Sequence, residues 1–184
     1  MSAIKFTHIA SSYNEYLDSL YAYALHMGFD EQTSMDAIHD VFYKLCTRHT
    51  SLDEIENLTF YLFRSLRNRL IDLKRSGREM QGISTLDEEY DEILPFHLHV
   101  TVEDEFISHE DADEIRLKVE QFLDQLTHRE REIVYLRYIQ ECSYEEISGL
   151  MEISVAASRN LVSKSIRKLR VASLTLTSLL LVIK

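Results

Sequence analysis

The chain has 184 residues and a formal net charge of −11, with 20 lysines and arginines against 31 aspartates and glutamates. Four glycines, one proline and little strand-like alternation predict an all-α protein. Cys46 and Cys142 stand outside any Cys-x-x-Cys motif, and the N-terminal residues lack an apolar signal-peptide core. These features argue against a disulfide-stabilised secreted protein, and we expect a cytoplasmic protein with reduced thiols.

The charge is divided unevenly along the sequence. Residues 1–75 hold 8 basic and 10 acidic residues, and residues 127–170 hold 8 and 6, so both blocks are nearly neutral. Residues 76–126 hold only 3 basic against 15 acidic residues. The net negative charge of the whole chain therefore does not exclude nucleic-acid binding by the two flanking blocks. We predict two small helical domains, residues 1–76 and 111–184, joined by an acidic linker over residues 77–110.

The first domain is expected to open with two helices. One passes through Tyr16–Leu25 and ends near Gly28, a residue suited to a helix C-terminus. The second begins near Ser34 and precedes a polar, turn-like stretch over residues 47–54. The apolar face predicted for this second helix comprises Ala37, Ile38, Val41, Phe42 and Leu45.

A basic helix over Tyr61–Arg75 completes the first domain. Its buried face is predicted to carry Leu62, Leu66, Leu70 and Leu73. Its solvent face is predicted to carry Phe60, Arg64, Arg67, Asn68, Ile71 and Arg75. An aromatic ring, an amide and guanidinium groups on one face suit phosphate contacts and stacking on unpaired bases. An ordinary solvated basic face is the alternative.

The linker combines Gly77, Gly82 and Pro95 with acidic clusters at residues 87–92 and 103–105. The short apolar segment Ile93–Phe96 is a candidate for docking on another part of the protein. The nearby histidines, His97, His99 and His109, lack the spacing of a metal site, and we expect no metal and no cofactor.

The second domain is marked by helix caps. After a helix over residues 112–126, Thr127 with Glu130 and Ser143 with Glu146 form two capping boxes. A tight turn then leads to Ser154, which caps a last helix through Leu169, and the two final helices outline a helix-turn-helix. The inward residues predicted for the last helix are Ser158, Val162, Ile166 and Leu169, and the outward ones are Ala156, Arg159, Asn160, Ser163, Lys164 and Arg167.

Arginine and asparagine can make bidentate contacts with guanine and adenine, so this last helix suits base recognition in the major groove. An ordinary basic helix at the end of a helical bundle is the alternative. The apolar segment Val171–Lys184 is too short to cross a bilayer. We expect it to extend the helix and pack on the domain or a partner, with peripheral membrane contact left open.

Two blocks of sequence resemble the sigma-70 family of RNA polymerase sigma factors, in the extracytoplasmic-function group. LTHREREIVYLRYIQECSYEEISGLMEISVAASRNLVSKSIRKLR resembles the fourth conserved region. SMDAIHDVF, together with YLFRSLRNRLIDLKR, resembles the second. The blocks occur in the family's order with a linker between them. The resemblance implies a subunit that binds core RNA polymerase, at the beta-prime clamp and the beta subunit, and directs initiation at promoter DNA.

The resemblance also implies site residues. Those matching the contacts with the minus-thirty-five element are Ser154, Ala156, Arg159, Asn160, Ser163, Lys164 and Arg167. Those matching the minus-ten element and the melted strand are Arg48, His49, Phe60, Tyr61, Arg64, Arg67, Asn68 and Arg75. Those matching the clamp contacts are Asp36, His39, Asp40 and Phe42. An anti-sigma factor is a further candidate partner, and no small-molecule substrate is expected.

The sequence departs from the family pattern at several positions. Met35 and His39 replace the usual glutamate and glutamine of the clamp motif. Glu141 and Glu152 replace glycines, which would cost about 1 kcal/mol at a residue of positive φ. Ser158 replaces a valine and needs a hydrogen-bond partner.

Two other classes of protein fit the sequence less well. A stand-alone helix-turn-helix regulator of duplex DNA is the main alternative, but it has no use for a base-stacking helix. An enzyme is not expected, because the sequence contains no nucleophile–base pair, metal-ligand cluster or phosphate-binding glycine loop.

Overall fold

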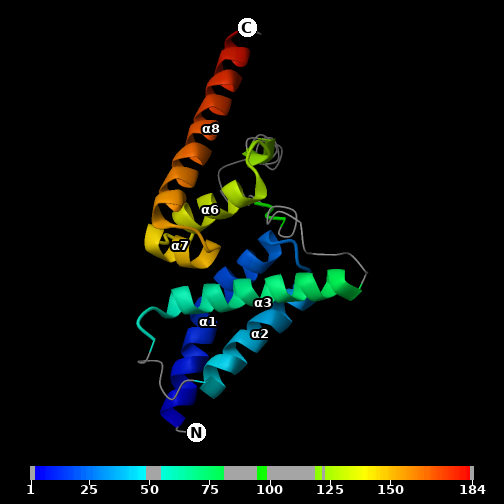
Figure 1. The fold of residues 1–184 in the computed structure, drawn as a ribbon, viewed down its shortest axis with the longest axis vertical. Helices are drawn as coiled ribbons and strands as arrows, with labels where there is room; N and C mark the ends of the chain where they lie inside the picture. The colour runs from blue at the N-terminus through cyan, green and yellow to red at the C-terminus, as the bar shows by residue number, and fades with distance from the viewer. Residues whose placement is uncertain (1–2, 49–54, 81–94, 99–118, 122, 183–184) are drawn as a thin grey trace, which may run out of the picture. The chain divides into compact units, whose positions relative to one another are not determined.

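The computed structural model describes residues 3–48, 55–80, 95–98, 119–121 and 123–182. Every regular element in these ranges is an α-helix, which confirms the predicted all-α class (Figure 1). The chain divides into two compact units, Met1–Pro95 and Phe96–Lys184. Most of the predicted acidic linker, residues 81–94 and 99–110, lies outside the described residues.

Unit 1 is a bundle of three helices, α1 (Ala3–His26), α2 (Glu31–Arg48) and α3 (Leu58–Met80). Helix α3 lies across both α1 and α2 (Figure 1). Tyr23 of α1 and Phe63 of α3 meet edge to face in the core, with ring centroids 5.4 Å apart. Other fully buried side chains are Leu20, Ala24, Ile38, Leu45, Leu62, Leu66 and Leu70.

Local signals in the sequence set the helix ends of unit 1. Gly28 has a φ of +79° and follows α1, as predicted for a glycine at a helix C-terminus. Asp30 caps α2, because its carboxylate accepts the backbone N–H of Thr33 at 2.9 Å. That hydrogen bond, and a second one from the Thr33 hydroxyl, lower the pKa of Asp30. Asn57 caps α3 by accepting the N–H of Phe60 at 2.8 Å.

Unit 2 contains α6 (His128–Tyr138), α7 (Tyr144–Met151) and α8 (Val155–Val182). Both predicted capping boxes are present, at the start of α6 and at the start of α7. The hydroxyl of Ser154 accepts the N–H of Ala157 at 3.1 Å and caps α8. The core of this unit includes Leu126, Ile133, Tyr135, Leu136, Ile147, Leu150, Met151 and Val162. The predicted helix-turn-helix is therefore formed by α7 and α8.

The two tyrosines of α6 differ in exposure, and the helix predicted before α6 is only partly within the described residues. Tyr135 is buried in α6, whereas Tyr138 is 54% exposed. Of the helix predicted over residues 112–126, only residues 119–121 and 123 are described as helical. Helix α8 continues to Val182, so the apolar segment extends this helix as expected. No helix in the described part of the chain is long and apolar enough to span a membrane.

Both positions where glutamate replaces a family glycine have left-handed backbone. Glu141 has a φ of 53° and Glu152 a φ of 54°. Glu152 ends α7, and its N–H donates to the carbonyl of Ser148. A side chain at such a position is strained by about 1 kcal/mol relative to glycine. The chain thus keeps the turn geometry that glycine favours without having glycine there.

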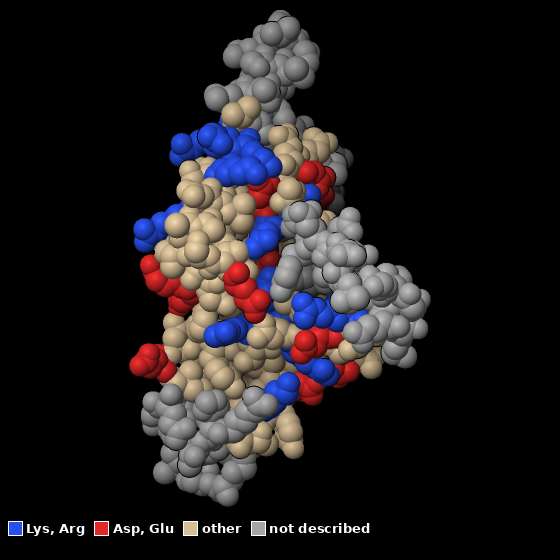
Figure 2. All heavy atoms as spheres, viewed as in Figure 1, with Lys and Arg blue, Asp and Glu red and all other residues tan. Residues whose placement is uncertain are grey.

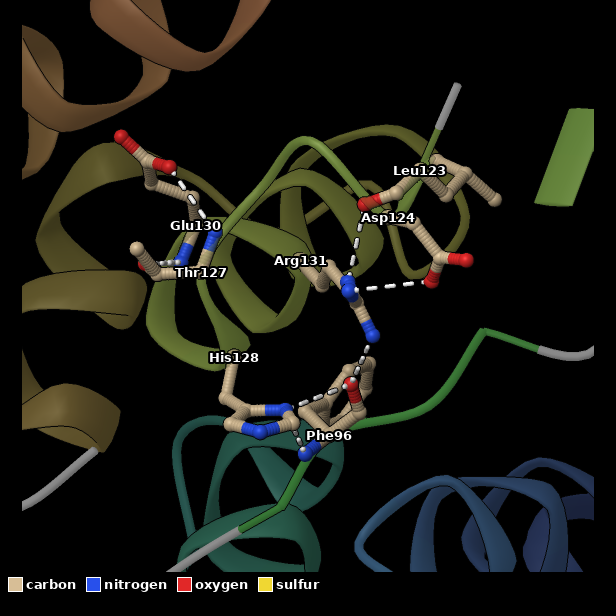
Figure 3. Close-up of polar contacts among 7 residues, drawn as sticks. All are labelled: Phe96, Leu123, Asp124, Thr127, His128, Glu130 and Arg131. Atoms are coloured by element: carbon tan, nitrogen blue, oxygen red, sulfur yellow. Dashed lines mark hydrogen bonds and ion pairs between the residues drawn. The ribbon is translucent and has the colours of Figure 1, made fainter. Parts of the chain in front are cut away.

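Pro95–Leu98, at the boundary of the two units, includes part of the apolar segment expected to dock, and Figure 3 shows how Phe96 is held. The Phe96 ring is 1% exposed and lies 5.5 Å from the ring of Tyr135, between centroids. Its N–H donates to Nδ1 of His128 at 3.0 Å, and its carbonyl accepts from Arg131 at 3.4 Å. Phe96 is therefore part of the core of unit 2, and the segment is not a free linker at this point.

Neither Cys46 nor Cys142 forms a disulfide bond. Cys142 is buried between α6 and α7, and burial raises its pKa to about 11. Cys46 is only partly buried on α2. Of the three linker histidines, His99 and His109 lie outside the described residues, and the described residues contain no cluster of three or more metal-ligating side chains.

Candidate nucleic-acid interface

Helix α8 presents the face that the sequence predicted. All seven residues expected to face DNA are exposed: Ser154, Ala156, Arg159, Asn160, Ser163, Lys164 and Arg167. Lysine and arginine side chains gather over this helix in Figure 2. On the opposite face Ser158 and Val162 are buried, at 0% and 3% exposure. Small side chains at the start of the helix leave room for the backbone to approach base edges.

The buried face of α8 includes two serines, one of which, Ser158, stands where the family pattern has valine. The hydroxyl of Ser158 donates to the carbonyl of Val155 at 2.8 Å and lies 3.3 Å from the carbonyl of Tyr144. The partner that this hydroxyl requires is therefore supplied by the turn of helix before it and by α7. Ser165 is also fully buried and donates to the carbonyl of Leu161 at 2.8 Å. These bonds satisfy both hydroxyls.

A buried carboxylate fixes α8 to α6. Glu130 is 1% exposed and accepts a 2.6 Å hydrogen bond from Nζ of Lys168, while Nζ of Lys164 lies 3.5 Å away. Burial by itself would raise the pKa of Glu130. The hydrogen bonds from Lys168 and the Thr127 N–H, with the charges of both lysines, instead lower it. Glu130 was predicted as a capping residue, and its bridge to α8 was not.

A hollow of about 430 Å³ lies beside the basic face of α8. Asn160 and Lys164 line it together with Arg129, from the first turn of α6. Arg129 was not among the predicted site residues. One signal for it was present in the sequence, because a cation in the first turn of a helix is unfavourable against the helix dipole.

The second candidate surface is the start of α3. Phe60, Arg64 and Asn68 lie on one side of the helix, and the Arg64 guanidinium carbon is 5.8 Å from the centre of the Phe60 ring. With Ile55–Asn57, Tyr61 and Ser65 they line a hollow of about 540 Å³. An aromatic face, an amide and a guanidinium around one hollow can hold an unpaired base and its phosphate.

Two residues predicted for the solvent face of α3 are buried. Arg67 is 3% exposed and Ile71 is 6% exposed, so the prediction of a six-residue basic face is wrong at these positions. The buried stripe of α3 is wider than a leucine repeat, because α1 and α2 both cover it. Phe63 joins the core for the same reason, whereas Leu73 is only half-buried. Arg75 is exposed as expected.

Two further predicted contacts cannot be placed. Arg48 is the last residue of α2, but its side chain lies outside the described residues. His49 and the rest of the loop to Glu54 also lie outside them.

The four residues of α2 that were predicted to contact the clamp are not all at the surface. Asp36 and His39 are exposed, and Nε2 of His39 is 3.0 Å from the hydroxyl of Tyr13. Asp40 pairs with Arg69 of α3 at 2.7 Å. Phe42 is 6% exposed and lies against the Tyr13 ring, so its prediction as a surface contact is wrong. The assignment of Phe42 to the buried face of α2 is confirmed.

Tyr43, which the prediction missed, is 70% exposed on α2. It follows Asp36 by seven residues and Asp40 by three, a spacing that places all three on one helix face. This periodicity could have marked Tyr43 as the surface aromatic residue beside Asp36 and Asp40.

Comparison with known proteins identifies the two units. Residues 12–79 match the family model of Sigma-70 region 2, and residues 116–169 match that of Sigma-70, region 4. The ECF RNA polymerase sigma factor SigM of Bacillus subtilis (strain 168) is 24% identical over 158 residues, which cover 86% of this chain and 90% of SigM.

A solved structure has the same fold. It is the sigma factor RpoE in complex with the anti-sigma factor NepR from Bartonella quintana, with a TM-score of 0.60 and 20% sequence identity. The match covers 90% of this chain and 96% of that one. A stand-alone helix-turn-helix regulator is not favoured, because unit 1 matches region 2. With both regions present in order, the chain belongs to the extracytoplasmic-function group of the sigma-70 family and is an RNA polymerase sigma factor.

Proposed function

We propose that this sigma factor reads a promoter at two separate places, with α8 at the minus-thirty-five element and the start of α3 at the minus-ten element. The observation that supports this most directly is the exposed basic face of α8, where every predicted contact residue is accessible. Arg159 and Asn160 would bond to base edges, whereas Lys164 and Arg167 would bind phosphates. Arg129, beside the same hollow, would hold a further phosphate.

For the minus-ten element, the hollow beside Phe60 is the proposed seat of an unpaired base. Phe60 would supply the stacking surface, and Arg64 and Asn68 would bind the strand. Tyr61 lines the same hollow, and Arg75 extends the basic face along the helix. Arg67 is not proposed as a DNA contact, because its side chain is buried.

Binding of core polymerase is assigned to α2 and to unit 2. Asp36, His39, Asp40 and Tyr43 would face the beta-prime clamp, with Tyr43 as the aromatic contact in place of Phe42. An exposed tyrosine among polar groups is typical of protein interfaces. Unit 2 would contact the beta subunit.

The protein is proposed to act in the cytoplasm, to have no catalytic activity and no cofactor, and to be held inactive by an anti-sigma factor. The structural neighbour RpoE is in complex with such an inhibitor, which supports a similar partner for this chain.

Run-off transcription with core polymerase and fragments of the protein's own genome tests the proposal. We expect discrete start sites that require this chain, and a stoichiometric complex with core polymerase in a pull-down. The variants Arg159→Ala and Phe60→Ala should each reduce transcription. If core polymerase is not bound at micromolar concentrations, or if the isolated chain binds one duplex sequence tightly at physiological salt, the proposal is wrong and the regulator class is favoured.

A further inference from the structure

The side chain of Arg159 does not project freely from α8. Its guanidinium carbon lies over the ring of Tyr144, 5.4 Å from the ring centre. Tyr144 is the first residue of α7, and its ring also carries the guanidinium of Arg137, at 4.9 Å. Two cations over one ring make this tyrosine the centre of a small cluster at the turn between the helices.

The ring is held in place by the structure around it. Tyr144 directly follows the Ser143 cap, whose N–H donates to Glu146 at 2.6 Å. Its backbone carbonyl lies 3.3 Å from the hydroxyl of Ser158, one residue before Arg159. Arg137 donates to the carbonyl of Cys142 at 2.7 Å. The Tyr144 ring that lies under Arg159 is thus held by contacts with both α7 and α8.

Arg159 has a second neighbour, Glu145, with 3.6 Å between Nη2 and Oε1. Both side chains are more than half exposed, at 61% and 66%, so the ion pair is weak. The ion pair also uses an N–H group that a base would need. The same N–H group of Arg159 therefore cannot bind Glu145 and a base at once. The contact with Tyr144 uses the face of the guanidinium and leaves its in-plane donors available.

We propose that Tyr144 is a positioning residue for base recognition: it holds the Arg159 guanidinium so that its in-plane N–H groups face a base pair of the minus-thirty-five element. This inference rests on the proposed role of α8. A long arginine side chain loses rotamer freedom when it binds, and a ring that restrains it beforehand reduces that loss. Tyr144 would therefore sharpen the choice of base rather than add a contact to DNA.

The test uses the complete holoenzyme and promoters that differ at each minus-thirty-five base pair. Tyr144→Leu should lower discrimination at the base pair read by Arg159 by about two- to fivefold. Tyr144→Phe keeps the aromatic ring and should therefore keep the wild-type base preference. Tyr138→Leu is the matched control, because Tyr138 is an exposed tyrosine of the same unit and should leave the preference unchanged.

A double variant separates positioning from a general structural effect. Tyr144→Leu should change little once Arg159→Ala is present, because both act on the same base pair. An equal loss of affinity for every promoter, or additive effects in the double variant, would overturn the proposal for Tyr144. If Arg159→Ala itself left the preference unchanged, the proposed role of α8 would fail as well, and the two failures are distinguishable. Thermal unfolding of each variant identifies loss of the fold.

Discussion

Helices α3 and α8 are both basic and amphipathic, yet the sequence predicted the surface of one and not of the other. Every outward residue predicted for α8 is exposed, whereas Arg67 and Ile71 of α3 are buried. The reason lies in their neighbours. Helix α8 meets α7 at Ser158 and α6 at Lys168, ten residues farther along the helix.

Helix α3 has neighbours on two sides. It meets α1 at Phe63, through the ring of Tyr23, and α2 at Arg69, through Asp40. Two covering helices bury adjacent positions in each turn, so the stripe broadens from a leucine repeat to include Phe63, Arg67 and Ile71. A basic residue beside a leucine repeat is therefore a weak sign of exposure when helices cover both flanks of the repeat.

The largest expected effect on stability that tests the difference between α3 and α8 is at Arg67. Arg67→Ala should lower the free energy of unfolding by about 2–4 kcal/mol, because it removes a long buried side chain from the centre of unit 1. Arg64→Ala, three residues earlier and exposed, should change it by less than about 0.5 kcal/mol. Urea unfolding followed by circular dichroism measures both.

The same pair separates stability from function. Arg64→Ala should weaken promoter melting, detected by permanganate reactivity of the open strand, without altering the minus-thirty-five preference. If Arg67→Ala proved as stable as the wild type, the broad buried stripe of α3 would be refuted.

In unit 2 the matching test concerns the bridge between α8 and α6. Lys168→Met keeps the apolar stem but leaves the buried Glu130 carboxylate without its 2.6 Å partner. We expect a loss of about 2–3 kcal/mol at neutral pH, somewhat less than for a fully buried pair because Lys168 is 35% exposed. Lys164→Met, whose amine is farther from Glu130 and more exposed, should cost less.

The loss of unfolding free energy in Lys168→Met should depend on pH. The pKa of Glu130 is lowered in the folded protein, so its stabilising contribution is present above the pKa of the unfolded chain. The contribution disappears as the pH falls through the folded value. The wild type and Lys168→Met should therefore converge in acid when unfolding is followed by hydrogen exchange of α6 and α8. A constant difference down to the acid transition would show that Glu130 is not the group involved.

A smaller effect is expected for Arg159→Ala, which tests the exposed face of α8. It should cost about 1–3 kcal/mol of promoter binding and relax the preference at one or two base pairs of the minus-thirty-five element. Binding of the holoenzyme to upstream mutants provides the measurement. Val171→Ala, at an exposed position of the same helix outside the predicted contacts, is the control for a general change in the helix. Impaired melting with an unchanged upstream preference would reverse the assignment of the two helices.

The smallest effect concerns the turn before α8. Glu152→Gly should raise the free energy of unfolding by up to about 1 kcal/mol, because glycine adopts a φ of 54° without strain. The same exchange at Glu15, an exposed residue inside α1, should lower it by about 0.5–1 kcal/mol. Calorimetry of both variants shows directly whether each exchange raises or lowers the free energy of unfolding. A destabilising Glu152→Gly would mean that the glutamate side chain offsets the strain.

Local sequence signals determined much of this protein. Ser143 with Glu146, Thr127 with Glu130, and Gly28 each act within a few residues, so the helix boundaries near them could be predicted from the sequence. The exposed face of α8 also followed from its periodicity. The family resemblance joined these pieces into a sigma factor, which the matches to regions 2 and 4 confirm.

The tertiary structure decided which charged and aromatic groups are buried. Glu130 was visible as a cap, but only the approach of α8 makes it a buried partner of Lys168. Arg67 and Phe42 are enclosed, and Tyr43 is exposed, because helices distant in sequence cover one side of α3 and α2 and leave the other open. Burial depends on which surfaces meet, and a single helix does not encode how many neighbours it will have.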